Sequence, residues 1–115
     1  MTKSADGAAA ERIAEAFLLA RELRLVERNY RCRGGEIDLI FQHGGALVFV
    51  EVRLRRSANF GGAAASVTRT KQARIMRAAR HYLAGRPECH CRFDVVLLDR
   101  LAPEGVEWIQ DAFGE

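Results

Sequence analysis

Hydrophobic and polar residues follow two different periods along this chain, and the two periods predict helices and strands in a definite order. Between residues 8 and 23, small and apolar residues recur every three or four positions, which is typical of an amphipathic helix. The same spacing returns over residues 68–83, until Gly85 and Pro87 end it. Each of these two segments is expected to bury one face against the rest of the protein.

Between and after these segments, short runs rich in Val, Ile, Leu and Phe predict strands. The predicted strands cover residues 25–30, 36–41, 47–53, 92–98 and 106–109. Consecutive strands suit a meander, and the second helix suits a crossover to a parallel strand. The pattern therefore predicts an α/β fold with a central mixed β-sheet flanked by helices, in the order αβββαββ.

The second and third predicted strands carry a distinctive pair of acidic residues. Gly44 and Gly45 between the strands suit a two-residue hairpin turn. Symmetric pairing about that turn places Asp38 opposite Glu51, with Cβ atoms about 4.5–5.5 Å apart. Two such carboxylates repel each other unless a cation lies between them, and a divalent ion with oxygen ligands would serve. A slip of one residue would undo the pairing, so a solvated hairpin face remains the alternative.

Length and composition indicate one globular domain over residues 1–115, because 49% of the residues are hydrophobic. No apolar run approaches the roughly 18 residues that span a bilayer, and the first residues lack a signal-peptide core. We therefore expect a cytoplasmic protein that does not enter a membrane. We expect residues 1–7 to be disordered, residues 55–66 to form a mobile basic loop, and the cysteines to be free thiols.

Basic residues are concentrated in one part of the chain. Between Val52 and Pro87 there are nine basic residues and no acidic one, although the net charge of the whole chain is only +3. Such segregation suggests a polyanionic partner, nucleic acid above all, and the alternative is a solvated helix face. The candidate phosphate-binding residues are Arg55, Arg56 and the basic ridge of Lys71, Arg74, Arg77 and Arg80.

Several short motifs together resemble a known family. They include Gly-Glu-Ile-Asp-Leu-Ile at 35–40, Phe-Val-Glu-Val-Arg at 49–53 and Arg-Phe-Asp-Val-Val at 92–96. These segments are similar to the bacterial YraN family, which is uncharacterised and thought to be endonuclease-like. An Asp on one strand followed by Glu-x-basic on the next also resembles the PD-(D/E)XK nucleases, among them the Holliday-junction resolvases.

The resemblance implies a restriction-endonuclease-like three-layer fold and a role for each of three acidic residues. Asp38 and Glu51 would bind a metal ion, and Glu11 on the first helix would complete or orient the site. The implied cofactor is Mg²⁺ or Mn²⁺, and the implied substrate is DNA, with branched DNA as one alternative. Junction resolvases of this fold act as dimers, so a homodimer is one alternative for the assembly.

One residue departs from the family pattern. The position two residues after the acidic Glu51 usually holds lysine, but here it holds Arg53. An arginine stays protonated in proteins and cannot serve as a general base, although it can bind a phosphate through two hydrogen bonds. We therefore keep two hypotheses, a Mg²⁺-dependent nuclease with Arg53 in the catalytic set and a catalytically silent nucleic-acid-binding protein. A third is an interaction protein whose basic face binds another acidic partner.

Overall fold

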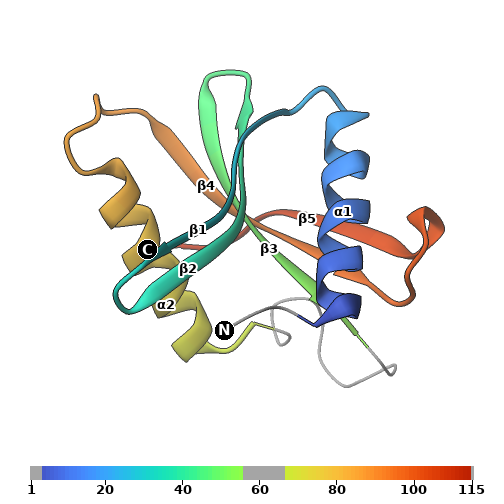
Figure 1. Cartoon of the computed structure of the whole chain (residues 1–115). Coiled ribbons are helices and arrows are strands. Elements are labelled where there is room, and N and C mark those ends of the chain that lie inside the picture. The colour runs from blue at the N-terminus through green and yellow to red at the C-terminus, as the bar shows by residue number, and fades with distance from the viewer. Residues whose placement is uncertain (1–3, 56–66, 115) are drawn as a thin grey trace.

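Two α-helices and a five-stranded sheet form the fold, in the order that the sequence predicts (Figure 1). The structure, a computed structural model, describes residues 4–55 and 67–114. The elements are α1 (Ala5–Leu19), β1 (Arg24–Cys32), β2 (Gly35–His43), β3 (Ala46–Leu54), α2 (Arg69–Leu83), β4 (His90–Leu98), the short 3-10 helix η2 (Pro103–Gly105) and β5 (Val106–Phe113). The mixed sheet and the order αβββαββ are confirmed.

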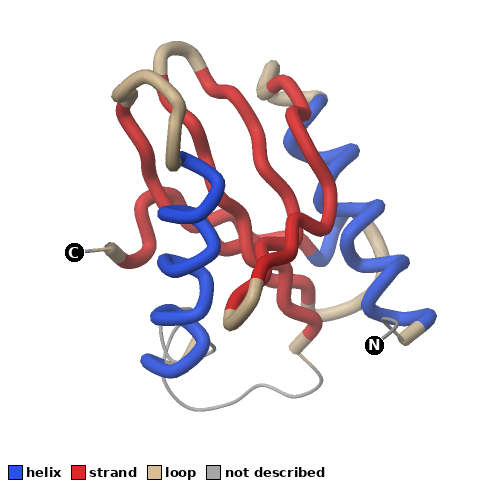
Figure 2. The backbone as a smooth tube through the Cα atoms, turned by 60° about the vertical axis from the view of Figure 1, so that its left-hand side comes forward, coloured by secondary structure: helices blue, strands red, loops and turns tan. Residues whose placement is uncertain are grey.

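The strands lie in the order β1-β2-β3-β4-β5, and only the β3–β4 pair is parallel. Helix α2 makes the crossover that this parallel pair requires. The two helices lie on opposite faces of the sheet (Figures 1 and 2). Each face has its own core: Ala14 and Leu18 of α1 belong to one, and Ile75 and Ala79 of α2 to the other. The molecule therefore has the three layers that we expected.

Helix α1 begins earlier than the sequence suggested. The Ser4 side chain accepts a hydrogen bond from the backbone N–H of Gly7, at 3.0 Å, and so caps the first turn. Residues 5–7 are consequently helical, and the expected disorder of residues 1–7 is wrong for them. The residues before Ser4 lie outside the described range.

Helix α1 also ends four residues before the predicted position. Glu22 adopts a positive φ of 69°, and the backbone N–H of Leu23 donates to the Leu18 carbonyl at 3.2 Å. This is a Schellman-type end, in which the left-handed residue is usually glycine. Because a glutamate occupies that place, the sequence carried no stop signal, and the predicted helix ran on to residue 23.

Helix α2 matches its prediction closely. Thr68 is the N-cap and accepts a hydrogen bond from the backbone N–H of Lys71, at 3.1 Å. The helix ends at Leu83, shortly before Gly85, whose φ of 79° suits glycine. Of the expected mobile loop, residues 56–66 lie outside the described range. No helix in residues 4–55 or 67–114 has the length and apolarity needed to cross a membrane.

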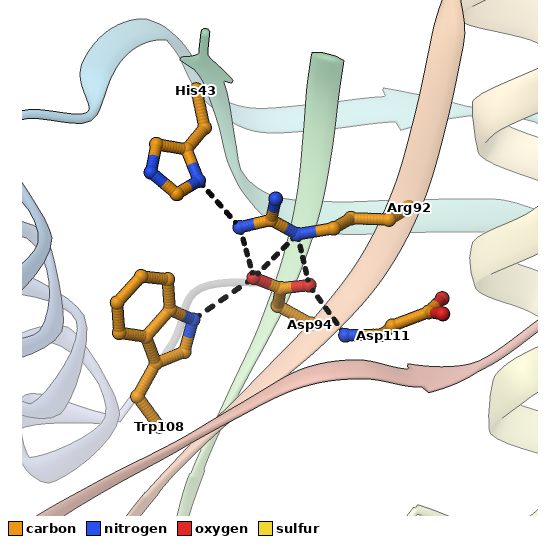
Figure 3. A network of polar contacts seen from close by, with 5 residues as sticks. All are labelled: His43, Arg92, Asp94, Trp108 and Asp111. Carbon is orange, nitrogen blue, oxygen red and sulfur yellow. Dashed lines mark hydrogen bonds and ion pairs between the residues drawn. The ribbon is translucent and has the colours of Figure 1, made fainter.

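A fully buried acidic residue, Asp94, joins β4 to β5 (Figure 3). Its carboxylate accepts hydrogen bonds from Arg92 Nε at 3.0 Å, from Trp108 Nε1 at 2.9 Å and from the backbone N–H of Asp111 at 2.9 Å. Phe93 pairs with Phe113 and Val95 pairs with Ile109, so β5 contains a bulge opposite Asp94. The bulge lets β5 continue to Phe113, where the sequence suggested only a terminal turn after residue 109.

Candidate functional site

The hairpin of β2 and β3 has the predicted register, and it opens at the two acidic residues. Paired residues run from His43 with Ala46 to Leu39 with Val50, which is where regular pairing stops. Asp38 and Glu51 come next on their strands. Beyond the last pair, the backbone N–H of Val52 on β3 donates a hydrogen bond to Oδ2 of the Asp38 side chain, at 2.9 Å. Because the backbones of β2 and β3 no longer pair here, the side chains of Asp38 and Glu51 occupy the end of the hairpin.

Both acidic side chains are buried, with relative exposures of only 4% for Asp38 and 3% for Glu51. Burial first, and then the neighbouring Asp38, raise the pKa of Glu51 to about 8, against the lowering effect of Lys71 and Arg53. One carboxylate oxygen of Glu51, Oε1, is buried and has no hydrogen-bond partner in the described structure. Buried acceptors without a hydrogen-bond partner are rare in folded proteins, and they are often found where a water, an ion or a substrate binds.

A cavity of about 210 Å³ opens at this point and collects side chains from both helices and from the sheet. Its acidic lining residues are Glu11 from α1, Asp38 from β2 and Glu51 from β3. Glu11 is itself only 8% exposed. The structure therefore brings to one cavity the three carboxylates that the family resemblance implied. The basic lining residues are Arg53 and Lys71.

The donor set suits a hard divalent cation, although it is not a ready-made metal cage. Among the residues that the structure describes, no three His, Cys, Asp or Glu side chains are placed to hold one ion together. Mg²⁺ does not require three, because it commonly keeps several waters and uses one or two carboxylates. The buried Asp38–Glu51 pair, with the unpartnered Oε1 of Glu51, fits such an ion, and Glu11 lines the same cavity.

Lys71 is the residue whose place differs most from our expectation. Sequence periodicity put it in a basic ridge that would contact phosphates, but its Nζ lies 3.7 Å from Glu51 Oε2 and 3.8 Å from Glu36 Oε1. The Lys71 side chain is 26% exposed and lines the carboxylate cavity. Periodicity alone could not reveal this, since it relates residues within one helix and not across to β3.

Arg53 lies on the other side of Glu51, with a guanidinium nitrogen 3.8 Å from Oε2. Its side chain is 44% exposed, so it flanks the mouth of the cavity. Symmetric pairing about the glycine turn would also put Glu36 opposite Arg53, but Glu36 forms ion pairs with Arg31 at 3.7 Å and with Lys71 at 3.8 Å. The reason is that β2 and β3 no longer pair beyond Leu39 and Val50.

Comparison with known proteins gives the family. The model of the uncharacterised protein family UPF0102 matches residues 10–98. This chain belongs to the UPF0102 family. Similar proteins include a UPF0102 protein of Nitrosospira multiformis, 56% identical over 114 residues that make up 98% of this chain and 96% of the relative. Another, from Dechloromonas aromatica, is 55% identical over 112 residues, which is 97% of this chain and 91% of the relative. The family resemblance seen in the motifs is confirmed.

The remaining arginines of the basic ridge lie on the outer face of α2 in this UPF0102 chain. Arg74, Arg77 and Arg80 are all exposed. Arg77 packs against the β1–β2 turn, where a Cβ added at Gly34 would lie 2.9 Å from a guanidinium nitrogen. Arg55 is half-buried at the end of β3, and Arg56 lies outside the described residues. The ridge is thus three exposed arginines long, and it begins one turn beyond the cavity.

A second, larger cavity of the UPF0102 fold was not anticipated from the sequence. It has a volume of about 890 Å³ and lies between α1 and β1, with Arg12, Arg28 and Arg31 among its lining residues. Glu11 lines both cavities, so the larger one adjoins the carboxylate site. Arg28 is fixed by two hydrogen bonds to Glu15, at 2.7 and 2.8 Å, which lower the pKa of Glu15. Only the folded arrangement of β1 beside α1 brings these arginines together.

Proposed function

We propose that this UPF0102 chain is a metal-dependent nuclease that hydrolyses phosphodiester bonds in DNA, with Asp38 and Glu51 as the metal-binding carboxylates. The observation that carries the proposal is the buried carboxylate pair itself. Folding has placed Asp38 and Glu51 side by side out of water and left Glu51 Oε1 without a partner. Such an arrangement costs stability in the free protein, and a cation bound between the two carboxylates would offset that cost.

The chemistry of hydrolysis suits these groups. When bound, Mg²⁺ or Mn²⁺ polarises the phosphate and lowers the pKa of a bound water. Water oxygen forms a bond to phosphorus while one P–O ester bond breaks; water loses a proton to solvent, and the departing oxygen gains one. Asp38 and Glu51 would hold the cation, and Glu11 would bind or orient its waters from α1. Arg53 at the mouth would bind a phosphate oxygen of the substrate.

Nucleic acid is the polyanion that the distribution of positive charge favours. The exposed arginines Arg74, Arg77 and Arg80 follow Lys71 along α2, and Arg55 directly follows the strand that carries Glu51. On the α1 side, the arginines of the 890 Å³ cavity continue the basic surface beyond Glu11. Phosphates contacted on both sides would place a phosphodiester over the carboxylates.

The decisive experiment is a cleavage assay on linear duplex, single-stranded and four-way-junction DNA, with Mg²⁺ and with Mn²⁺. Wild-type protein should cut at least one substrate, and Asp38→Asn should abolish the activity because it removes a charged ligand. Asp99→Asn is the matched control, since Asp99 is an exposed carboxylate that pairs with Arg100. Binding without cleavage under every condition would replace the nuclease by the silent binding protein.

Binding is tested separately through its salt dependence. Each phosphate contact releases counterions, so the logarithm of the DNA affinity should fall steeply with the logarithm of salt concentration. Replacing Arg74 and Arg77 together with Ala should reduce that slope by roughly one to two units. A slope that stays unchanged would show these arginines to be an ordinary solvated helix face.

A further inference from the structure

Lysine is rare in this chain, and one of its lysines lies in the carboxylate cavity. Of the 18 basic residues, only Lys3 and Lys71 are lysines, and all others are arginines. The other positively charged residues of α2 are all arginines, namely Arg69, Arg74, Arg77 and Arg80. The one helical position with a lysine is also the one whose side chain reaches Glu51. A lysine differs from an arginine by presenting a compact ammonium on a flexible stem.

The helix fixes where this ammonium lies. The backbone N–H of Lys71 donates to the Thr68 side chain, so Lys71 belongs to the capped first turn of α2. From there Nζ lies between two carboxylates, 3.7 Å from Glu51 and 3.8 Å from Glu36. Both distances exceed those of a direct hydrogen bond, so the ammonium neutralises the carboxylates without being locked to either.

We propose that Lys71 is a catalytic residue of the proposed hydrolysis, and that its ammonium binds a non-bridging oxygen of the scissile phosphate. This inference rests on the nuclease function proposed above. Both the Arg53 guanidinium and the Lys71 ammonium line the cavity of about 210 Å³, and the ammonium is the more compact of the two charged groups. Once Glu51 binds a cation, its charge no longer holds Lys71, and the Nζ donors become available to the phosphate. Positive charge at that point stabilises the phosphate oxygens as negative charge grows on them.

The position of Arg53 supports this division of roles. Both cations approach the same oxygen of Glu51, at 3.7 and 3.8 Å, but from different elements. The Arg53 side chain is 44% exposed, against 26% for Lys71. Lys71 is therefore the more enclosed cation, as expected for the one that contacts the reacting group, and Arg53 is placed for the phosphate at the mouth.

The first test uses Mn²⁺ affinity, which needs no catalysis, alongside cleavage. Lys71→Met keeps the length of the side chain and removes its charge. Because it removes a competing cation next to Glu51, we expect Mn²⁺ to bind a few fold more tightly in calorimetric titrations. Cleavage should nevertheless fall by roughly 10²–10³-fold in kcat. Ala73→Met, at an exposed neighbouring position of α2, should change neither quantity. A variant that binds Mn²⁺ more weakly, or cleaves as well as wild type, overturns the proposal.

The second test moves the lysine. Arg53→Lys in the Lys71→Met background places an ammonium beside Glu51 from β3 in place of α2. If the missing function is an ammonium in the cavity, the double variant should regain at least tenfold in kcat over Lys71→Met. A purely structural role of Lys71 predicts no such rescue, and its absence overturns the assignment.

A third measurement separates this inference from the nuclease proposal. Binding of inorganic phosphate to the Mn²⁺-loaded protein should weaken at least fivefold in Lys71→Met and stay unchanged in Ala73→Met. If wild type cuts no nucleic acid but shows this difference, the nuclease proposal fails while phosphate binding by Lys71 stands. Equal phosphate affinity in wild type and Lys71→Met would reject the role of Lys71 whether or not the protein cleaves.

Discussion

Two buried carboxylate centres lie on neighbouring strands of one sheet and have opposite surroundings. Asp94 on β4 pairs with Val50 on β3, and Glu51 is the next residue of β3 after Val50. Asp94 is fully buried and receives donors from Arg92, Trp108 and the Asp111 backbone (Figure 3). Glu51 is nearly as buried, faces a second carboxylate and keeps one oxygen without a hydrogen-bond partner.

The two centres differ in how the chain compensates a buried acidic side chain. The donors to Asp94 belong to the chain and are held in place, so its charge is compensated as soon as β4 and β5 pair. In the centre of Glu51 and Asp38, by contrast, Glu51 Oε1 has no hydrogen-bond partner among the residues that the structure describes. Because a buried like-charged pair disfavours its own ionisation, that centre lowers the stability of the protein at neutral and alkaline pH. The sheet therefore carries one carboxylate whose hydrogen bonds stabilise it and a buried pair whose ionisation lowers the stability of the fold.

The largest expected effect is on the stable centre. Asp94→Ala would leave the half-buried Arg92 guanidinium and Trp108 N–H without their shared acceptor, which should lower the free energy of unfolding by about 3–5 kcal/mol. Urea denaturation would measure it. Asp99→Ala, at an exposed ion pair with Arg100, is the control and should cost less than about 1 kcal/mol. A cost at Asp94 no larger than at Asp99 would remove the contrast between the two centres.

The second prediction concerns the pH dependence at Glu51. Its pKa is raised from 4.5 in the unfolded chain to about 8 in the folded protein. The folded state therefore binds the proton more tightly, and stability falls as pH rises from about 4.5 to about 8. Glu51→Gln removes this loss, so at pH 9 without metal the variant should be roughly 2–5 kcal/mol more stable than wild type.

At pH 4.5 the gain from Glu51→Gln should be small, because the wild-type side chain is then protonated in the folded state. The difference in unfolding free energy between wild type and variant, measured at both pH values, isolates this residue from all other titrating groups. Glu36→Gln is a suitable control, since Glu36 is 30% exposed and pairs with Arg31 and Lys71. A gain from Glu51→Gln that is independent of pH would contradict the burial of an ionisable pair.

The third prediction concerns the stabilisation of the fold by a divalent cation. A ligand that binds only the folded state stabilises it by about 2.7 kcal/mol at a concentration one hundred times its dissociation constant. Saturating Mg²⁺ at pH 8 should therefore stabilise wild type by about 2–3 kcal/mol and have little effect on Asp38→Asn or Glu51→Gln. Thermal unfolding with and without Mg²⁺ measures this. Equal stabilisation of all three proteins would place the ion elsewhere and return the carboxylate pair to a structural role.

Much of this arrangement followed from local sequence signals. The two-glycine turn determines the hairpin register, so the meeting of Asp38 with Glu51 was predictable from residues 36–53 alone. The end of α2 at Leu83 likewise follows from Gly85 and Pro87, which come shortly after it. These features share one property, which is that the interactions deciding them span only a few positions or one turn.

The features that sequence analysis missed depend on contacts between distant segments. Lys71 belongs to the basic series of α2 by its spacing, and only the packing of the first turn of α2 beside β3 brings its Nζ to Glu51. The continuation of β5 past the bulge requires Asp94, 17 positions earlier, to accept the Asp111 N–H. The early end of α1 is a local feature, but a glutamate at positive φ gives no warning of it.

The smallest expected effect sharpens the account of the stable centre. Asp94 uses the backbone N–H of Asp111 and not its side chain, and Asp111 has a positive φ of 53°. Asp111→Gly keeps that N–H and suits the conformation, so its unfolding free energy should lie within about 1 kcal/mol of wild type. Asp111→Val also keeps the N–H, but a β-branched residue is strained there and should cost about 1–3 kcal/mol. Chemical denaturation of both variants measures the difference. If Asp111→Gly were as damaging as Asp111→Val, the side chain of Asp111 would be part of the centre, and its backbone geometry would not explain the bulge.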